Sequence, residues 1–354
     1  MMLKKRKKQS TSMAQKIFFF TLLIFVVNIY ACTDFILKDL NNDVVVGRSM
    51  EFGIDLQSEI VYFPKDDGNT NTQACTQERS SWINKYAYVG ITVFGLNMVV
   101  DGMNEKGLSI ETLWFPGAKY PPFPKKHQGM TIPLEDLSNW ILASFSNVEE
   151  AKQKLKNIYI LPRIIPQLNE IPPIHLSLHD KEGNSLTIEF IDGKMELLDN
   201  SVGVLTNAPK LEWHITNLRN YINLSSINKD SIIFDGSVFQ PTGEGTGLLG
   251  IPGDWTPPSR FVKIAILKNF ALKAKTTKEN INLAFHLLNT VDIPYGIIQS
   301  SNGKEYDHTQ WVVVKDLSHQ KLYYRTYKNM NIRCFDLKKE KGKKGKKFPM
   351  KGTN

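Results

Sequence analysis

The chain has 354 residues, enough for one large domain or two small ones, and a formal net charge of +9 at pH 7. Residues 1–31 and residues 336–354 each contribute +6, so the body between them carries about −3. A body with this charge argues against nucleic-acid binding as the main task. We predict that the lysine-rich segment 336–354 is a solvated, disordered tail.

The first 31 residues have the order of a secretory signal peptide. Residues 4–8 are basic, residues 17–30 are almost wholly apolar, and Ala31 is a small residue at the end of that run. The apolar run is shorter than the about 20 residues that a membrane-spanning helix needs. We therefore predict cleavage after Ala31 and a secreted or periplasmic protein. Its mature form would begin at Cys32 and have no stable membrane span.

Cleavage at this point would place a thiol and a free α-amine on one residue. A free cysteine has a pKa of about 8.5 and an α-amine one of about 7.7–8.0. The neutral amine could therefore take the thiol proton without a histidine. Two other interpretations stay open. Cys32 is an ordinary thiol beside a signal sequence, or residues 29–32 are a lipoprotein processing site at which the cysteine is acylated, for which Tyr30 is bulky.

After Cys32 the pattern predicts a hairpin of strands at 33–38 and 44–50, joined by turn residues at 41–43. The second strand carries Arg48 near its end, so Arg48 and Glu51 are expected near Cys32. Further predictions in the first half are strands at 59–63, 87–100 and 109–114, a polar loop at 65–80, and helices at 132–145 and 147–157.

The second half of the chain also contains both predicted strands and predicted helices. The predicted elements are strands at 174–178, 185–190 and 194–198, helices at 211–222, 260–272 and 277–288, a loop at 242–253, and a hairpin at 311–315 and 321–326. Strands dominate both ends, and there is no regular alternation of strand and helix. This order favours an α+β layered fold over a parallel doubly wound sheet.

The cysteines and histidines do not indicate a metal site. The chain has three cysteines, and no cysteine or histidine cluster has the spacing of metal ligands. Cys75 and Cys334 either pair in an oxidising compartment or stay unpaired and buried. His175 and His179 lie four residues apart in an extended segment, and we interpret them as core or surface residues.

Four motifs behind Cys32 carry a family resemblance. They are GRSMEFG at 47–53, DGMNEKGL at 101–108, LTNAP at 205–209 followed by WHITNLRNY at 213–221, and GIPGDWTPPSRF at 250–261. In this order they resemble the choloylglycine hydrolase family, which contains bile salt hydrolases and penicillin V acylases. The resemblance runs from Cys32 to about residue 330, so residues 32–335 are expected to form one catalytic domain.

The resemblance implies the four-layer αββα sandwich of the N-terminal nucleophile hydrolases, an α+β fold. It also implies hydrolysis of a small-molecule acyl amide that is linear and not a peptide, no metal or organic cofactor, and a homotetramer. Cys32 matches the nucleophile, with its own α-amine as the base. Arg48 matches an arginine whose charge favours the thiolate. Asn207 matches the oxyanion-hole asparagine, and Arg260 the second arginine of the active site.

Two positions depart from the bile salt hydrolase pattern. Glu51 stands where the family commonly has an aspartate near the α-amine. Trp114 stands where bile salt hydrolases have asparagine and many penicillin V acylases tyrosine; its backbone N–H would serve the oxyanion hole and its indole the acyl pocket. We therefore predict a penicillin V acylase-like enzyme. The alternatives are a conjugated bile salt hydrolase, an acyl-homoserine-lactone acylase, or an acylated lipoprotein that is a binding module with an inactive enzyme fold.

Overall fold

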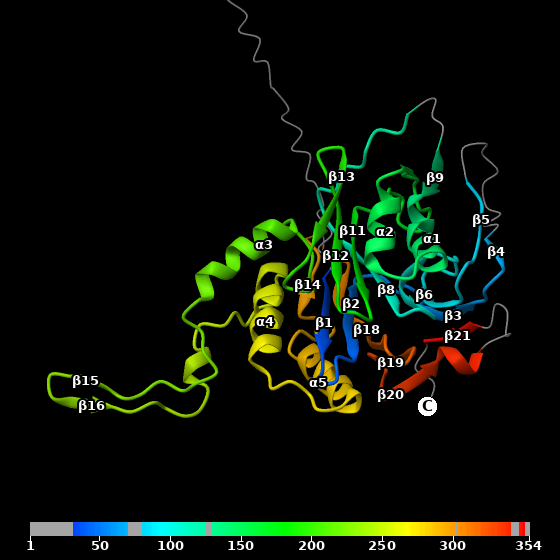
Figure 1. Cartoon of the computed structure of the whole chain (residues 1–354). Helices are drawn as coiled ribbons and strands as arrows, with labels where there is room; N and C mark the ends of the chain where they lie inside the picture. Colours follow the sequence, from blue (N-terminus) through cyan, green and yellow to red (C-terminus); the bar gives the residue numbers. More distant parts are fainter. Residues whose placement is uncertain (1–30, 70–79, 125–128, 302, 341–346, 351–354) are drawn as a thin grey trace, which may run out of the picture.

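Two antiparallel sheets face each other and form the centre of the molecule (Figure 1). The computed structural model describes residues 31–69, 80–124, 129–301, 303–340 and 347–350. The predicted signal peptide, apart from Ala31, and Cys75 lie outside these residues. Cys334 is exposed, so the predicted alternative of a buried, unpaired Cys334 is wrong. The pairing of Cys334 with Cys75 stays a prediction.

The seven-stranded sheet contains the start of the predicted catalytic domain. Its order is β14-β1-β2-β18-β19-β20, and β17 pairs with β18. The bounds are β1 Cys32–Lys38, β2 Val44–Phe52, β14 Val204–Leu205, β17 Ile298–Gln299, β18 Tyr306–Asp316, β19 Lys321–Thr326 and β20 Asn329–Asp336. The predicted hairpins at both ends of the chain, β1–β2 and β18–β19, are therefore neighbours in one sheet.

The eight-stranded sheet has the order β13-β12-β11-β8-β7-β6-β3-β21. Its bounds are β3 Glu59–Phe63, β6 Tyr88–Thr92, β7 Val99–Asn104, β8 Leu108–Trp114, β11 Ile174–Asp180, β12 Ser185–Ile191, β13 Lys194–Asp199 and β21 Lys347–Pro349. Three small pairs accompany the two sheets: β4 Gly68–Asn69 with β5 Trp82–Ile83, β9 Met130–Pro133 with β10 Ile158–Leu161, and β15 Ile232–Phe234 with β16 Ser237–Phe239.

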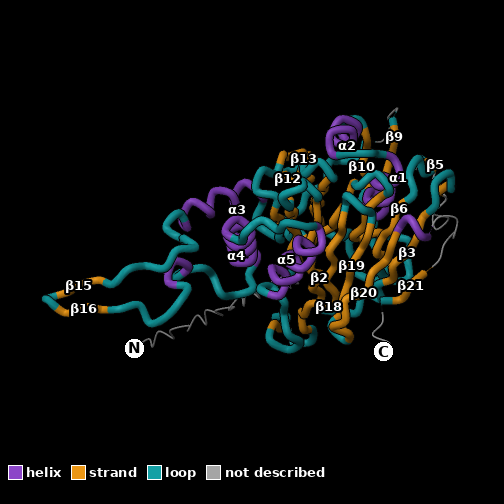
Figure 2. The backbone as a smooth tube through the Cα atoms, turned by 60° about the horizontal axis from the view of Figure 1, so that its bottom comes forward, coloured by secondary structure: helices purple, strands orange, loops and turns teal. Residues whose placement is uncertain are grey.

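Helices cover the outer face of each sheet. Helices α1 Leu137–Ser144 and α2 Val148–Leu155 pack on the eight-stranded sheet, and α4 Pro257–Phe270 and α5 Thr277–Asn289 on the seven-stranded one (Figures 1 and 2). Helix α3 Leu211–Asn217 packs on α4. The layers thus run helix, sheet, sheet, helix, which confirms the predicted four-layer αββα sandwich.

Some predicted elements have different bounds for local reasons. The single strand predicted at 87–100 is two strands, because Phe94 and Gly95 take positive φ angles of 59° and 69° and turn the chain. The helix predicted at 132–145 begins only at Leu137, because Met130–Pro133 pairs with β10. Helix α4 begins at Pro257, where the missing N–H of proline costs nothing.

The lysine-rich end is not a disordered tail throughout, and the prediction for 336–354 is wrong for its described residues. Leu337–Glu340 form a turn of 3-10 helix, and Lys347–Pro349 form β21, which pairs with β3 at the edge of the sheet. Phe348 packs edge-on against Phe335, with ring centroids 5.2 Å apart. Met350 is buried. These apolar side chains hold the segment against the body despite its charge.

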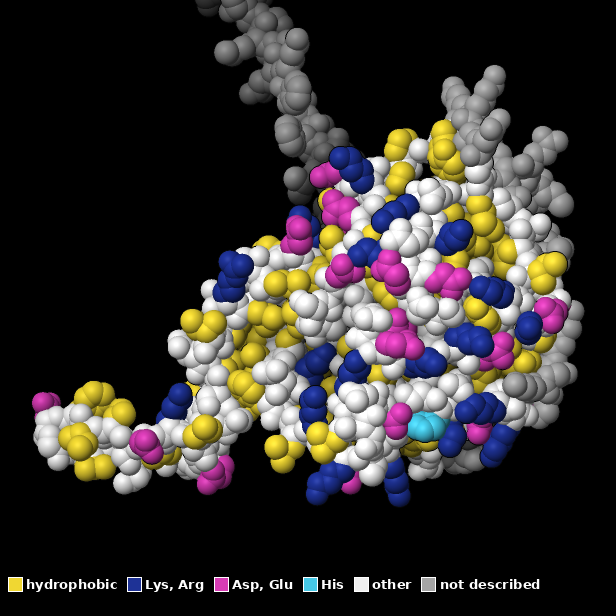
Figure 3. Space-filling model, in the orientation of Figure 1, with side chains coloured by type: hydrophobic (Ala, Val, Ile, Leu, Met, Phe, Trp, Pro, Cys, Tyr) yellow, Lys and Arg dark blue, Asp and Glu magenta, His cyan; other side chains and the backbone are white. Residues whose placement is uncertain are grey.

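An arm, residues 225–247, projects from the body between η2 Leu218–Tyr221 and α4 (Figures 1 and 2). A backbone hydrogen bond of 2.9 Å between Ser225 N and Gly247 O closes its base. The hairpin β15–β16 forms its tip, where hydrophobic side chains gather (Figure 3). The exposed apolar residues of the tip are Ile232, Ile233, Phe234, Val238 and Phe239.

Candidate active site

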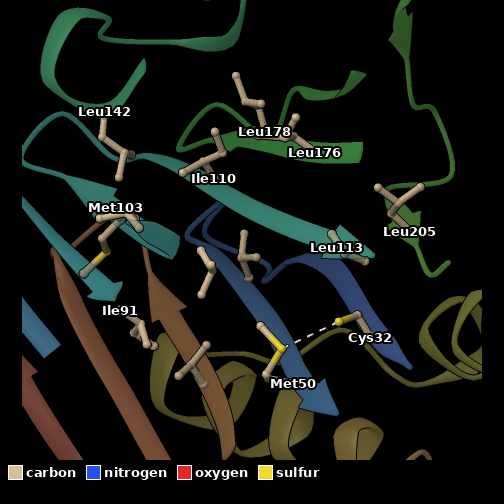
Figure 4. Packing of buried hydrophobic residues seen from close by; sticks show 14 of the residues in the cluster. Cys32, Met50, Ile91, Met103, Ile110, Leu113, Leu142, Leu176, Leu178 and Leu205 are labelled. Carbon is tan, nitrogen blue, oxygen red and sulfur yellow. Dashed lines mark hydrogen bonds between the residues drawn. The ribbon is translucent and has the colours of Figure 1, made fainter. Parts of the chain in front are cut away.

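Cys32 opens strand β1 and is buried between the two sheets, with 1% of its surface exposed. β1 lies between β14 and β2, and the antiparallel register sets Cys32 opposite Met50. The sulfur atoms of these two residues lie 3.8 Å apart (Figure 4). Leu113 of the other sheet lies next to them in the same view. Met50 and Leu113 therefore give the thiol apolar neighbours on this side.

Asn207 lies two residues beyond β14, the strand that pairs with β1 on its other side. The backbone nitrogen of Cys32 donates a hydrogen bond to Asn207 Oδ1 at 2.7 Å. Asn207 Nδ2 donates to the carbonyl oxygen of Trp114 at 2.7 Å. Ala31 still precedes Cys32 here, so the bonded nitrogen is an amide.

Arg260 fixes the orientation of the Asn207 amide. It lies in the first turn of α4 and is fully buried. Its Nη2 donates to Asn207 Oδ1 at 2.7 Å, and its Nη1 donates to Thr33 Oγ1 at 2.7 Å and to the Cys32 carbonyl oxygen. Because Oδ1 accepts from both Arg260 and Cys32, the NH₂ group of Asn207 must point to the opposite side, toward Trp114.

Arg48 reaches from β2 across to the eight-stranded sheet. Its Nη2 lies 3.4 Å from Cys32 Sγ and donates to the Thr112 carbonyl at 2.6 Å. Its Nη1 donates to the Val100 carbonyl at 3.2 Å. The guanidinium also lies over the Trp311 ring, 5.7 Å from its centroid. These contacts hold a fully buried positive charge against the thiol.

Burial is the largest influence on the Cys32 thiol, and it raises the thiol pKa above its ordinary value. Arg48 lowers this pKa, Glu51 raises it, and Arg260 and a backbone hydrogen bond from Trp114 lower it further. Arg48 thus acts with the sign that the resemblance implies. Since the net shift is upward, the thiol needs a base to become a thiolate near neutral pH.

Glu51 follows Met50 by one residue in β2, so its side chain lies on the opposite face of the strand. Its Oε1 accepts a hydrogen bond from Thr309 Oγ1 at 2.9 Å, and its backbone N–H donates to the Ala31 carbonyl at 3.0 Å. Burial raises the pKa of the Glu51 carboxyl to about 7, while Arg260 lowers it. The backbone of Glu51 therefore holds Ala31, the residue before Cys32, and Thr309 holds the Glu51 carboxyl group.

Trp114 ends β8 and lines a small apolar cavity beside the thiol. The cavity has a volume of about 40 Å³, and its walls include Cys32, Phe52 and Leu168. The Trp114 ring packs edge-on against Phe52, with centroids 5.8 Å apart. All six predicted site residues thus lie around one buried point, where the start of β1 meets the ends of β2 and β8, the segment after β14 and the start of α4.

The sequence analysis missed Met50, Thr33 and Thr309 as neighbours of the site. Met50 follows from the predicted hairpin, because an antiparallel register that pairs Asp34 with Arg48 also pairs Cys32 with Met50. Thr33 is the residue next to the predicted nucleophile. Thr309 carries no local signal, since β18 joins β2 only in the folded sheet.

In the described part of the chain, Asp34, Glu111 and His179 offer three buried ligand atoms within 4.8 Å of one another. The ammonium group of Lys315 lies 2.6 Å from Glu111 Oε1, so the chain itself supplies a cation there. His175 and His179 are both buried in β11, as core histidines. Among the described residues, no helix is long and apolar enough to cross a membrane.

The fold and site define a linear amide hydrolase with the N-terminal nucleophile architecture, and comparisons with known proteins agree. Residues 32–343 match the model of linear amide C–N hydrolases, choloylglycine hydrolase family. A bile salt hydrolase/transferase of Clostridium perfringens is 34% identical over 317 residues, 87% of this chain and 93% of the relative. A penicillin V acylase of Pectobacterium atrosepticum is 25% identical over 330 residues, 87% of this chain and 81% of the relative.

The solved structures are similar over the same extent. A single-residue variant of conjugated bile acid hydrolase from Clostridium perfringens has a TM-score of 0.82 at 31% identity, covering 91% of this chain and 98% of the other. The penicillin V acylase of Agrobacterium tumefaciens shares the fold, with a TM-score of 0.73 and 24% identity over 89% and 90% of the two chains. The protein belongs to the choloylglycine hydrolase family and is a linear amide C–N hydrolase.

Proposed function

We propose that cleavage after Ala31 frees Cys32 as the catalytic nucleophile and that its α-amine is the base. The observation that carries this proposal is the pair of contacts at Cys32: its nitrogen on Asn207 Oδ1 and its sulfur against Arg48. One residue thus presents a nitrogen and a sulfur to two separate fixed partners. The family match also begins at residue 32.

The first half of the reaction is attack of Cys32 Sγ on the amide carbonyl. The α-amine accepts the thiol proton, Asn207 Oδ1 orients the amine, and Arg48 stabilises the thiolate as it forms. The C–S bond forms and the carbonyl π electrons move to oxygen; when the carbonyl forms again, the C–N bond breaks and the ammonium group gives its proton to the leaving nitrogen. In the second half the same amine takes a proton from water, which attacks the thioester carbonyl. The C–S bond then breaks, the acid is released, and the ammonium group returns a proton to the Cys32 sulfur.

The negative charge that develops on the carbonyl oxygen needs donors fixed in advance. Asn207 Nδ2 carries two N–H groups, of which one donates to the Trp114 carbonyl. The other N–H and the backbone N–H of Trp114, which already interacts with the thiol, would form the oxyanion hole. Loss of one such donor typically costs about 2.7–4 kcal/mol in the barrier. Arg260 contributes by holding the Asn207 amide in this orientation.

The maturation test uses variants of the chain start. A form that retains Ala31, made by blocking cleavage, lacks the α-amine at Cys32 and should lose turnover by a factor of at least about 10² because the general base is gone. Its thermal unfolding should stay that of a folded protein. The matched form begins at Cys32 and should be active, with the mass of an unmodified N-terminus. Full activity with Ala31 retained would refute the mechanism, and a diacylglycerol mass on Cys32 would favour the lipoprotein alternative.

For the acyl group, we propose a flat aromatic or short apolar substituent, as in penicillin V-like amides. The cavity beside the thiol is small and is lined by Trp114 and Phe52. An aromatic acyl group could stack on the indole, a contact worth about 0.5–1.5 kcal/mol beyond area burial.

The second candidate is hydrolysis of conjugated bile salts. It is favoured by the similarity to the Clostridium perfringens bile salt hydrolase/transferase, which exceeds that to the Pectobacterium atrosepticum penicillin V acylase. A rigid steroid would have to displace Trp114 or enter past it. The two candidates therefore make opposite predictions about this side chain.

Replacement of Trp114 by asparagine tests the pocket. The unmutated enzyme should hydrolyse phenoxyacetyl amides faster than glyco- or tauro-conjugated bile acids. Trp114→Asn should lower phenoxyacetyl turnover roughly tenfold, the equivalent of about 1.4 kcal/mol, and raise the relative rate for larger acyl groups. Trp213→Asn is the control, because Trp213 is exposed and lies outside the cavity. Faster bile acid turnover by the unmutated enzyme would establish the second candidate.

We also propose that the protein is exported and assembles with further copies of itself, a tetramer by the resemblance. Export is supported by the basic and apolar order of residues 1–31. Assembly is supported by the arm, whose tip exposes Ile233 and Phe234 at 67% and 62%. Exposed apolar patches of this kind mark interaction sites.

Light scattering of the mature protein tests the assembly. The unmutated protein should have the mass of an oligomer, and the double variant Ile233→Ser/Phe234→Ser should dissociate to smaller species because the apolar tip is lost. Ile83→Ser is the matched control, an isoleucine that is 68% exposed on the body instead of the arm. A monomeric unmutated protein, or an unchanged mass for the double variant, would contradict the role of the arm.

A further inference from the structure

A connected group of buried charges lies behind Cys32, between the two sheets. One sheet contributes Asp34, Arg48 and Lys315, and the other contributes Asp101, Glu111 and His179. All six are fully buried. Their strand registers bring them together: Asp34 pairs with Arg48, and Asp101 pairs with Glu111. Buried charges are costly unless they are paired, so the arrangement of this group is constrained.

Lys315 is the centre of the group. Its Nζ lies 2.7 Å from both carboxylate oxygens of Asp101 and 2.6 Å from Glu111 Oε1. Asp34 has its own partner, His179, whose Nε2 lies 2.8 Å from Asp34 Oδ2. Each carboxylate thus has a cationic or imidazole partner other than Arg48.

Within the described ranges, Arg48 has no carboxylate in hydrogen-bond contact. The nearest one there is Asp101, whose Oδ2 lies 4.0 Å from Arg48 Nη1. The N–H groups of Arg48 are instead directed at the carbonyls of Thr112 and Val100 and at the Cys32 sulfur. A guanidinium and a carboxylate left to themselves would close to about 2.7–2.9 Å, usually through two hydrogen bonds. Another group must therefore hold the Arg48 guanidinium and the Asp101 carboxylate apart.

We propose that Lys315 and Asp101 are positioning residues for Arg48. Lys315 binds both oxygens of Asp101 and keeps this carboxylate back from the guanidinium. Asp101 still supplies a negative charge near enough to make the burial of Arg48 tolerable. Arg48 therefore keeps its Nη2 on the Cys32 thiol and is not drawn into an ion pair. This inference rests on the proposed role of Cys32, and it gives a function to the aspartate of the DGMNEKGL motif at 101–108.

Without Lys315, Asp101 would turn toward Arg48 and form the direct ion pair. The guanidinium would then move away from the sulfur, and part of its charge would be neutralised. Both changes raise the thiol pKa, so less thiolate would be present at pH 7. The other charged groups that face the thiol or Arg48 are Glu51, Arg260, Asp34 and Glu111. His179 bonds Asp34, and the proposed cleavage would add the α-amine of Cys32. All of these groups stay in place in the test variants unless named.

The test uses two variants that keep the buried charge balanced, because removal of one partner alone can unfold a protein. Lys315→Met/Glu111→Gln removes the ammonium and one carboxylate but leaves Asp101 free to close on Arg48. Lys315→Met/Asp101→Asn removes the ammonium together with the carboxylate that would close. The first variant should raise the pH at which the Cys32 thiol ionises by about one unit, which corresponds to a tenfold lower kcat at pH 7 with KM nearly unchanged. In the second variant, both the pH of thiol ionisation and kcat should lie close to those of the unmutated protein.

Thiol ionisation is followed by the ultraviolet absorbance of the thiolate. For each variant, the absorbance of the same variant that also carries Cys32→Ser is subtracted, so that only the signal of Cys32 remains. Val312→Ala is the control for lost stability, since Val312 is buried in the same strand as Lys315 and bonds none of these charges. An unchanged thiol titration in the first variant, or an equal shift in both double variants, would overturn the proposal. A failure of the proposed nucleophile would be recognised separately, because Cys32→Ala would then keep its turnover.

Discussion

The hydrogen bond from the Cys32 nitrogen to Asn207 Oδ1 is the contact on which the site depends. It joins the first residue of β1 to the segment that follows β14, two parts of the chain 175 residues apart. The sheet makes this possible, because β14 pairs with β1 on one side while β2 pairs with it on the other. Arg260 then adds a second donor to the same oxygen. The amide of Asn207 consequently has a single orientation in which its N–H groups point away from Cys32.

Burial determines how the thiol can react. A thiol with 1% exposure ionises poorly, because the thiolate loses the solvation of water. The positive charge of Arg48 offsets part of this lost solvation, but Arg48 is itself a buried cation. The charges between the sheets balance Arg48 without pairing with it directly. The architecture thus places a fixed positive charge beside a buried thiol, and the nitrogen of the same residue would become the base after the proposed cleavage.

Much of this arrangement could be predicted from the sequence, because its parts are local. The hairpin of β1 and β2 follows from two short apolar runs around turn residues, and it places Arg48 near Cys32. The helix that holds Arg260 was predicted at 260–272, and its observed start lies three residues earlier, at Pro257. The roles of Asn207 and Trp114 came from a family resemblance, since nothing near them in the sequence points to Cys32.

What could not be predicted depends on contacts between distant strands. The residues around Lys315 give no sign that this lysine is buried. Its burial between the sheets follows from the pairing of β18 with β2, which places β18 inside the seven-stranded sheet. Phe348 stands in a run of lysines, and its packing on Phe335 outweighs their preference for solvent. The arm has apolar residues in a hairpin that the periodicity did not reveal, because both of its faces are exposed in the single chain.

The central claim is that Cys32 carries the acyl group during turnover. Rapid acid quenching of the mature enzyme with a phenoxyacetyl amide, followed by mass analysis of its peptides, measures this directly. The account predicts that the peptide beginning at Cys32 gains the mass of one acyl group early in the reaction, and that Cys32→Ala abolishes both the adduct and turnover. An adduct on another residue, or full turnover by Cys32→Ala, would contradict it.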